Sequence, residues 1–409
     1  MKAQLETLHK RVAGIDVHRM KHVATVLIED AAGNLTRETR EFGGFKRDLK
    51  ALAEWLRESR VELVIIESTG IYWKSVYARL EDVGLCIWVV NAHHVKNVPG
   101  HKTDVADSEW LAQLGRYGLV RPSFIPPKDL RQLRIISRYR IKLDRTMSAE
   151  TNRLHKLLDD AGIKLGGLVS DINGKAASAI VDGLLDGLAP CELIKLSGRL
   201  RASKEDLLAS LEGDLTARHR FVLLEIRKHL RELEGHLETV DTYLRDAMVP
   251  YAWAWTLLQT IPGISEIAAA LILIEIGDDL SHFGNADRFA SWAALCPGNN
   301  ESAGKRKSGK TRKGNSVIRY LLCEAANGAI RTLSVFREKY RGLVVRRGHK
   351  KAIVAIAHKM IRTIYFMLTR RQTYHDSGFD YAAANVKKNA PRWIKALELH
   401  GYVVKLSAA

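Results

Sequence analysis

Two short apolar runs near the amino end of the chain each stop at an acidic residue. Residues 12–15 end at Asp16, and residues 63–66 end at Glu67. A short apolar run of this kind is typical of a strand buried in the middle of a sheet. Because carboxylates are rarely buried, an acid directly after such a run is expected at the end of a central strand. The first part of the chain is therefore expected to contain a sheet in which two central strands each end at an acidic residue.

Neighbouring segments complete an α/β pattern. Residues 22–28 follow the first run after a short break, so the two are expected to pair as a β-hairpin, and residues 85–90 supply a further strand. Helical periodicity appears between the strands, at about residues 45–58 and 70–83. We therefore expect residues 1–125 to form an α/β domain with a mixed sheet and flanking helices.

Two further acids, Asp104 and Asp107, stand three residues apart in a helical pattern, so they would share one face of a helix. Together with Asp16 and Glu67 they can converge on one or two hard cations, and Mg²⁺ or Mn²⁺ takes oxygen ligands of this kind. Two such ions about 4 Å apart can clamp both oxygens of a phosphoryl displacement. This order of acids predicts a metal-dependent nuclease domain of the RNase H/RuvC type. Taken singly, each acid could equally be a solvated strand end or helix face.

Composition indicates the partner. The chain has 64 Lys and Arg residues against 46 Asp and Glu residues, a formal charge of +18, and this balance favours polyanions such as nucleic acid through counterion release. A chain of 409 residues that is 46% hydrophobic can bury a sizeable core and is expected to split into two or three domains.

Cysteine usage and hydropathy indicate the compartment. The four cysteines are far apart and form no Cys-x-x-Cys pair, so neither a disulfide scaffold nor a zinc site is indicated. No apolar stretch approaches the roughly 20 residues that span a bilayer, and the first residues lack the hydrophobic region of a signal peptide. We therefore expect a cytoplasmic, nucleoid-associated protein with no membrane partner.

Past Pro126 and Pro127 the pattern becomes helical for more than a hundred residues. Two long segments carry apolar residues on alternating three- and four-residue steps, as in a coiled coil. They are Leu133, Ile136, Leu143, Met147, Leu154 and Leu157 in the first segment, where Arg140 and Glu150 are polar interruptions of the stripe, and Val222, Ile226, Leu230, Leu233, Leu237, Val240 and Leu244 in the second. Residues 161–190, rich in Gly and Ala, would connect the two helices, which could pair within one subunit or between subunits.

Basic residues crowd the first of these helices. They form either a solvated face or a track for a nucleic-acid backbone. The residues are Arg131, Arg134, Arg138, Arg140, Lys142 and Arg145.

A Pro-Gly turn at Pro262 and Gly263 precedes an apolar helix over residues 267–276. A turn that feeds a helix N-terminus in this way is the hairpin of a helix-hairpin-helix module, and its backbone amides can hold a DNA phosphate. An ordinary tight turn between buried helices is the alternative.

Small, turn-forming and cationic residues dominate the segment 296–315, which a helix over residues 316–330 follows. This composition predicts a flexible loop that closes over phosphates. The residues expected to contact nucleic acid here are Lys305, Arg306, Lys307, Lys310, Arg312 and Lys313. The stretch from Gly304 to Thr311 also matches the P-loop pattern. We reject a nucleotide site because no β-branched strand precedes Gly304 and three of the four variable positions are Lys or Arg.

The joint order of these motifs resembles the DEDD transposases of the insertion-sequence one-hundred-ten family. The likeness runs from about residue 11 to about residue 370. It rests on residues 14–18, 67–70, 102–107 and 261–264 and on the segment from Ser302 to Asn315. Each motif is short, but their order along the chain is specific.

The resemblance implies an RNA-guided DNA recombinase. Asp16, Glu67, Asp104 and Asp107 would be its metal-binding tetrad, and Ser302 would be its nucleophile. It further implies a bridge RNA that pairs with donor and target DNA, and a homo-oligomer, either a dimer or a tetramer.

The resemblance also implies a division into domains. We expect a RuvC-like domain over residues 1–125, a helical coiled-coil region over 126–250 and a mainly α transposase domain over 251–372. Residues 373–409 would be a basic appendage, either a mobile arm on nucleic acid or a docked helix.

A serine nucleophile suits the chemistry. A hydroxyl that attacks a DNA phosphate leaves a phosphoserine link and a free 3′-hydroxyl, so rejoining needs no ATP. Bound metal and the cations that follow Ser302 would stabilise the developing charge. Ser308 is the rival, because it is followed directly by Gly as the family's serine usually is, whereas Ala303 follows Ser302. The distances from Pro297 and to Asn315 favour Ser302.

Three classes of function are open. The first is a serine-dependent recombinase, and the second is a RuvC-like metal-dependent junction nuclease without a covalent serine step. The third is a non-catalytic nucleic-acid scaffold. The acids argue against the scaffold, since clustered carboxylates would repel the phosphates that it binds.

Overall fold

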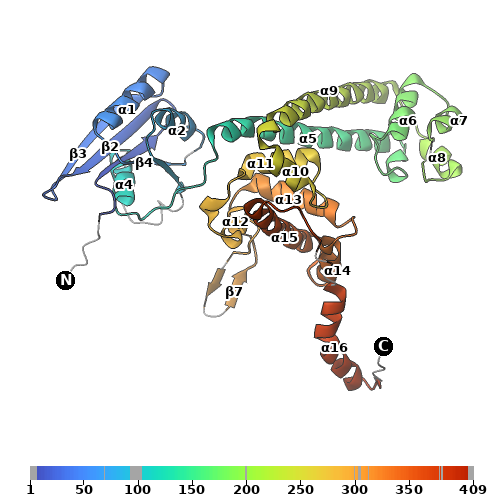
Figure 1. Ribbon diagram of the computed structural model, residues 1–409. Coiled ribbons are helices and arrows are strands. Elements are labelled where there is room, and N and C mark those ends of the chain that lie inside the picture. Colours follow the sequence, from blue (N-terminus) through green and yellow to red (C-terminus); the bar gives the residue numbers. More distant parts are fainter. Residues whose placement is uncertain are drawn as a thin grey trace. The chain divides into compact units, whose positions relative to one another are not determined.

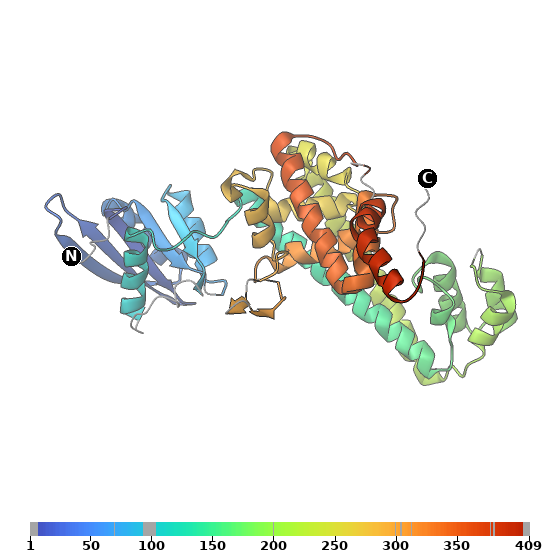
Figure 2. The same ribbon diagram turned by 90° about the horizontal axis from the view of Figure 1, so that it is seen from below.

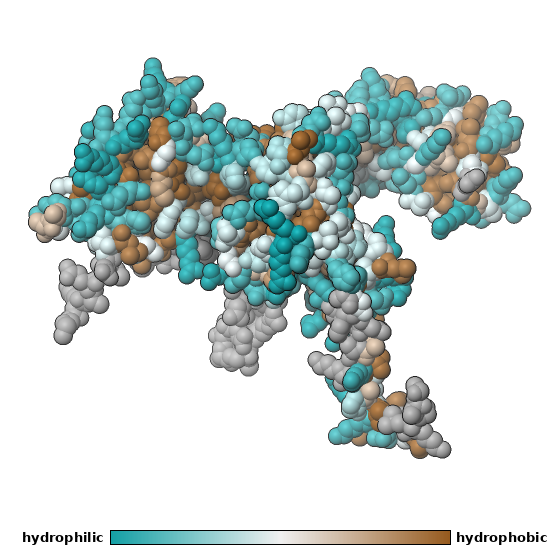
Figure 3. Space-filling view, in the orientation of Figure 1, coloured by the Kyte–Doolittle hydropathy of each residue, from teal (hydrophilic) through white to brown (hydrophobic). Residues whose placement is uncertain are grey.

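The computed structural model describes residues 7–68, 70–92, 104–198, 200–298, 300–302, 305–311, 313–376, 378 and 381–403. The chain divides into two compact units, Met1–Ile125 and Pro126–Ala409 (Figure 1). The predicted fold class is confirmed, because the first unit is a mixed sheet with flanking helices and the second is mainly helical. Figure 3 shows a largely hydrophilic surface with scattered apolar patches.

The first unit is built on a five-stranded sheet with the strand order β3-β2-β1-β4-β5. Strands β1, β2 and β3 form an antiparallel meander, whereas β1 pairs with β4, and β4 with β5, in parallel. The predicted hairpin of the first two strands is therefore confirmed. The elements of this unit are β1 Arg11–Val17, β2 Lys21–Glu29, β3 Leu35–Gly43, α1 Lys46–Glu58, β4 Leu63–Glu67, α2 Trp73–Asp82, β5 Ile87–Val90 and α4 Asp104–Arg116.

Helices cover both faces of the sheet (Figure 2). On one face Ala13, Ile15 and Ile66 pack against buried residues of α1 and α2. On the other face Val12 and Ile65 pack against buried residues of α4. The central strands are buried on both sides, which explains their continuous apolar runs.

Strand β3 is absent from the sequence prediction. Its side chains are mostly exposed, and it carries a charged sequence at the edge of the sheet. Edge strands are commonly charged in this way, because charge discourages pairing with other chains. The apolar pattern that identifies a strand is therefore missing from β3.

The second unit contains two long helices and a helical bundle. Its elements are α5 Lys128–Asp160, α6 Lys175–Asp186, α7 Pro190–Leu193, α8 Lys204–Leu211, α9 Ala217–Ala247, α10 Ala252–Gln259, α11 Glu266–Ile276, α12 Ala286–Trp292, β6 Asn300–Ser302, β7 Lys305–Ser308, α13 Ser316–Ala329, α14 Val335–Arg347, α15 His349–Arg370 and α16 Tyr381–Leu399.

Helices α5 and α9 pack against each other within the chain, with Leu143, Leu233 and Leu237 between them. Pairing within one subunit is thus observed, and pairing between subunits stays a hypothesis. The predicted apolar stripe of α9 is buried except at Val240, which is partly buried, and at its start, where Val222 is 43% exposed and its neighbour Leu223 is fully buried instead.

The connection between α5 and α9 is larger than the predicted segment 161–190. It holds α6, α7 and α8, which form a core with the ends of the two long helices. Leu158, Ile180 and Leu223 are all buried in this core. The connection is therefore a small helical subdomain, because its Ile, Leu and Val residues supply an apolar face for each helix.

Helix α15 is the core helix of the remaining bundle, where it contacts α12, α13 and α14. By length and composition alone this helix could cross a membrane, but half of its most apolar stretch is buried in the core of the protein. Helix α16 contacts α14, but most of its described side chains are exposed, so the mobile arm and the docked helix both stay open for the basic appendage.

Candidate active site

The acids Asp16 and Glu67 lie at the same end of two neighbouring strands. Because parallel strands β1 and β4 pair Ile15 with Ile66, the next residue on each strand stands at the same level. Side chains alternate along a strand, and Val12 and Ile65 face α4. Asp16 and Glu67, four and two residues further on, therefore also face the side of the sheet that α4 covers.

Helix α4 crosses this face in close contact because of two glycines. A Cβ on Gly14 would lie 2.1 Å from the carbonyl oxygen of Ser108, and a Cβ on Gly115 would lie 2.5 Å from a side-chain carbon of Ile65. Gly115 thus lies near the start of the strands and Ser108 lies over Gly14. The helix consequently runs against the direction of β1, and its first turn lies toward the strand end that carries Asp16.

This topology brings the four predicted acid positions to one end of the sheet. Positions 104 and 107 fall in the first turn of α4. Asp107 is exposed, and the side chain of Asp104 is outside the described part of the chain. Among the side chains that the structure describes, no three Asp, Glu, His or Cys residues meet in an arrangement that could hold a metal. The metal-binding tetrad therefore stays a prediction.

A histidine that the sequence reasoning did not assign contacts Asp16. The Nε2 atom of His18 lies 3.0 Å from Oδ2 of Asp16, and the histidine side chain is 52% exposed. A ring N–H at Nε2 would donate to the carboxylate and orient it, as outer partners of metal ligands do. The signal in the sequence was the two-residue spacing, which places side chains on one face of an extended segment.

Buried hydroxyl groups join α4 to the sheet by hydrogen bonds. The side chain of Ser108 lies 2.7 Å from Oγ1 of Thr25 on β2, and Thr25 in turn lies 2.9 Å from the hydroxyl of Thr39 on β3. Ser108 and Thr25 are fully buried. This chain of hydrogen bonds fixes the register between helix and sheet, since a buried hydroxyl without a partner is costly.

The segment that carries Ser302 is a hairpin, where the sequence analysis expected a flexible loop. Strand β6 pairs with β7, Ser302 opposite Lys305, and Pro297 pairs with Thr311 at the base. The predicted flexible loop is therefore wrong in its secondary structure, because Lys305–Ser308 pairs with β6 through its backbone despite a cationic sequence that does not favour a strand.

The predicted nucleic-acid contacts of this segment lie partly outside the description. The side chains of Ser302, Lys305, Arg306, Lys307 and Ser308, and all of Arg312, are outside the described part. Lys310 and Lys313 are exposed. These two cations are placed where a polyanion can reach them.

The structure supports the rejection of a P-loop in this segment. In a P-loop the residues that correspond to Lys310 and Thr311 open a helix, so that backbone amides point at the phosphates. Here both residues precede α13, which begins only at Ser316. Helical amides are thus absent at the matching positions.

The Pro-Gly turn joins α10 and α11, as predicted. Gly263 has a positive φ of 87°, and a Cβ there would lie 2.3 Å from the carbonyl oxygen of Ala325 on α13. The glycine is required by this close approach to α13. A DNA phosphate contact at Gly263 stays a prediction.

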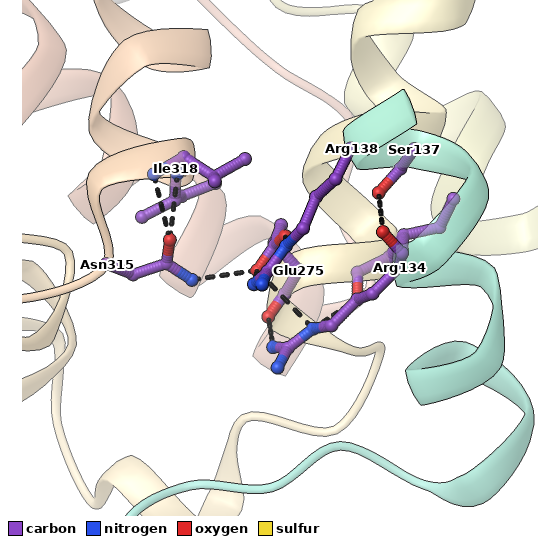
Figure 4. A network of polar contacts seen from close by, with 8 residues as sticks. Arg134, Ser137, Arg138, Glu275, Asn315 and Ile318 are labelled. Atoms are coloured by element: carbon purple, nitrogen blue, oxygen red, sulfur yellow. Dashed lines mark hydrogen bonds and ion pairs between the residues drawn. The ribbon is translucent and has the colours of Figure 1, made fainter. Parts of the chain in front are cut away.

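A buried glutamate ties the end of the serine segment to α5 (Figure 4). Glu275 on α11 has no exposed surface, and Arg134 and Arg138 of α5 reach its carboxylate at 3.3 and 3.0 Å. Asn315 donates to Oε2 of Glu275 at 2.8 Å and also accepts hydrogen bonds from Val317 and Ile318, the first amides of α13. Burial lowers the pKa of Arg134 to about 10, so that residue stays cationic at neutral pH.

This cluster corrects one expectation about the basic residues of α5. Arg134 and Arg138 pair with Glu275, and Arg140 forms two hydrogen bonds with Asp241 of α9 at 2.9 and 3.1 Å. These three side chains are structural. They are not a free track for nucleic acid, because each is paired with a carboxylate of α11 or α9, although the Arg138 side chain is 45% exposed.

Two family models match the chain. A model of DEDD type, described as "Transposase", matches residues 13–163, and a model described as "Transposase IS116/IS110/IS902 family" matches residues 255–341. The first match covers the acid positions of the sheet and α4, and the second covers the Pro-Gly turn and the serine hairpin.

Curated relatives match along most of the chain. A "Probable family 20 transposase" of Pseudomonas aeruginosa is 26% identical over 343 residues, which are 80% of this chain and 91% of that protein. A "Transposase for insertion sequence element IS1111A" of Coxiella burnetii is 23% identical over 325 residues, covering 77% of this chain and 80% of that protein. A solved structure of T. thermophilus RuvC with a Holliday junction substrate is 15% identical, with a TM-score of 0.22, over 28% of this chain and 99% of that chain.

Proposed function

Because the chain belongs to the IS110 family of insertion-sequence transposases, we propose that it cuts and rejoins DNA with a carboxylate metal site in the first unit and Ser302 as nucleophile in the second. The observation that carries the proposal is the convergence of Asp16, Glu67 and the first turn of α4 at one end of the sheet. Transposase domains of the DEDD type generally use divalent metal ions for catalysis.

The acid positions suit hard cations. Carboxylate oxygens are the donors that Mg²⁺ and Mn²⁺ prefer, and the residues that would hold them are Asp16, Glu67, Asp104 and Asp107. When bound, such ions stabilise the charge on the attacking and leaving oxygens of an in-line phosphoryl transfer. His18 orients the Asp16 carboxylate from its exposed side.

The serine step balances as a transesterification. The hydroxyl oxygen of Ser302 attacks the scissile phosphorus, a serine O–P bond forms, and the bond from phosphorus to the 3′-oxygen breaks. The serine proton leaves to a base, and the departing 3′-oxygen takes up a proton. The products are a phosphoserine diester and a free 3′-hydroxyl. Attack of a 3′-hydroxyl from a new strand on the phosphoserine joins the strands and releases the serine, so no ATP is needed.

We include a bridge RNA and a homo-oligomer in the proposal. The net charge of +18 favours binding of nucleic acid, both DNA and RNA, through release of counterions. A guide that pairs with donor and target DNA would supply the sequence specificity, while the protein supplies the chemistry.

Trapping of a covalent intermediate tests the serine. The purified protein, with its noncoding RNA, is incubated with labelled donor and target DNA and Mg²⁺, denatured and analysed for a protein–DNA adduct by mass spectrometry. We expect the adduct at Ser302, and we expect Ser302→Ala to abolish it and to lower strand exchange by at least roughly 10³-fold, as loss of a nucleophile does. Ser308→Ala is the matched control and should keep the adduct.

The same experiment separates the alternatives. If Ser302→Ala cuts DNA as well as the unmodified protein while Asp16→Asn does not, the chain is a metal-dependent junction nuclease without a covalent serine step. If neither variant changes cutting, the catalytic proposal fails as a whole. Removal of divalent metal with a chelator should stop cutting by the unmodified protein.

A further inference from the structure

A cavity of about 770 Å³ lies in the second unit at the base of the serine hairpin. One side of its wall consists of the two legs of the hairpin, where Pro297 pairs with Thr311. The other side consists of α14 and the first half of α15. Ser302 lies five residues beyond Pro297 along the same hairpin.

The wall has two chemical zones. Its rim is cationic, with Lys339 and Arg347 from α14 and Lys350 and Lys351 from the start of α15, whereas its floor is apolar. The apolar residues are Leu295, Leu343, Ala352, Val354 and Ala355. Among the described residues that line the cavity, none is acidic. The cavity therefore suits an anion that carries an apolar or aromatic part.

A neutral imidazole completes the floor. Burial lowers the pKa of His358, and the neighbouring charge of Lys339 lowers it further. His358, which lines the cavity, is therefore mainly uncharged at neutral pH.

Size and chemistry favour an unpaired nucleotide as the ligand. Pockets that take small molecules usually measure about 300–1,000 Å³, so this cavity is large enough for a nucleotide. Duplex DNA offers its phosphates to a cationic rim but keeps its bases stacked inside. A base can reach an apolar floor only when the strand is unpaired or the base is flipped out.

We propose that the cavity receives a nucleotide of the unpaired DNA strand next to the phosphate that Ser302 attacks. Lys339, Arg347 and the Lys350–Lys351 pair hold its phosphates, and the apolar floor covers its sugar and base. The proposal rests on the proposed function, because the serine hairpin marks the position of the scissile strand.

Binding of a short single strand by the full chain tests the cavity. The probe is a fluorescein-labelled thymidine hexamer, and its dissociation constant is measured by anisotropy. Ala355→Phe fills the floor without changing charge and should weaken binding at least roughly fivefold, the effect of losing one stacked base. Lys350→Ala with Lys351→Ala removes two rim cations and should weaken binding at least roughly tenfold at moderate salt.

Matched controls separate the cavity from general effects. Ala149→Phe adds the same bulk at an exposed position of α5, and Lys156→Ala with Lys228→Ala removes the same charge from exposed positions of α5 and α9. Both controls should stay within about twofold of the unmodified chain, with unchanged thermal midpoints for all variants.

Three outcomes would overturn the proposal. Ala355→Phe could bind the hexamer as tightly as Ala149→Phe, or the cavity variants could lose affinity for a thymidine–adenosine duplex as much as for the single strand. The cavity variants could also weaken a uridine hexamer but not the thymidine hexamer, which would assign the cavity to RNA. Ser302→Ala should bind the hexamer normally, so a failed serine mechanism and a failed cavity proposal give different results.

Discussion

Glu275 shows how a single residue links distant parts of the second unit. Its carboxylate has no exposed surface, and it receives two arginines of α5 and the side chain of Asn315. Asn315 also caps α13, directly after the serine segment. Because a buried charge without partners is very costly, these four side chains hold each other in one arrangement. The end of the serine segment is thereby fixed to α11 and α5.

Removal of this charge should be strongly destabilising. In Glu275→Gln the two arginines lose their counter-charge, and Arg134 is only 16% exposed. We expect the free energy of unfolding to fall by about 3–5 kcal/mol, the usual cost of breaking one side of a buried ion pair. Urea denaturation followed by circular dichroism measures this change.

A surface pair on the same unit provides the control. Glu238 lies 3.4 Å from Arg245 and is 73% exposed. Glu238→Gln should change the free energy of unfolding by less than about 1 kcal/mol. Equal losses in the two variants would show that Glu275 is not a buried anchor.

At the scale of elements, the candidate metal site depends on how closely α4 lies on the sheet. Gly14 allows the backbone of α4 to touch β1, and the Ser108–Thr25 hydrogen bond fixes the contact. The first turn of α4 lies toward the strand end that carries Asp16 and Glu67 only while this packing is kept. Glycine here is a packing requirement, since no side chain fits between strand and helix.

Gly14→Ala should therefore damage both stability and cutting. Its Cβ would meet the Ser108 carbonyl oxygen at 2.1 Å, and backbone must move to relieve that contact. We expect a loss of about 1–3 kcal/mol in the free energy of unfolding, as for overpacked cores. Metal-dependent DNA cutting, measured at a temperature where the variant remains folded, should fall as α4 shifts.

Gly235 on α9 is the matched control, because no atom lies within 4 Å of a Cβ added there. Gly235→Ala should stabilise the protein by up to about 1 kcal/mol, since alanine favours a helix interior. A Gly14→Ala protein that is as stable and as active as Gly235→Ala would contradict the proposed seating of α4.

At the scale of the whole molecule, charge governs encounter with nucleic acid. The chain carries a formal charge of +18, and three arginines of α5 are paired with carboxylates within the fold. Further cations lie at the rim of the cavity and at the exposed positions Lys310 and Lys313. Binding should accordingly be dominated by phosphate contacts and released counterions.

Affinity for DNA should fall steeply with salt. If about 6–10 phosphates are contacted, raising the salt from 50 to 200 mM should weaken binding by roughly 10³–10⁵-fold. Anisotropy titrations over this range give the slope of log affinity against log salt. Lys350→Ala with Lys351→Ala should reduce the slope by about 1–2, whereas a slope near zero would contradict phosphate-dominated binding.

Local pattern was sufficient to predict the central strands, the long helices and the Pro-Gly turn. Buried β-branched runs and heptads can be recognised from residues that are close together in the sequence. The same is true of the acids Asp16 and Glu67, which follow apolar runs. These features were predicted with nearly the observed bounds. The pairing of the first two strands followed from their short connection.

Other features depended on residues far apart in the chain. The charged edge strand β3, the subdomain of α6, α7 and α8, and the extended pairing of β6 with β7 carry weak local signals. His18 beside Asp16 and the cavity between the serine hairpin and α15 appeared only in three dimensions.

The basic residues of α5 show most clearly what the sequence predicts and what only the tertiary structure decides. From the sequence alone, Arg134, Arg138 and Arg140 were surface charge or a nucleic-acid track. The fold brings Glu275 and Asp241 to them from 137 and 101 residues away. Sequence determined that these side chains are cationic and lie on a helix. Only tertiary structure decided whether protein or DNA would neutralise them, because burial beside a distant carboxylate sets the partner of a charge.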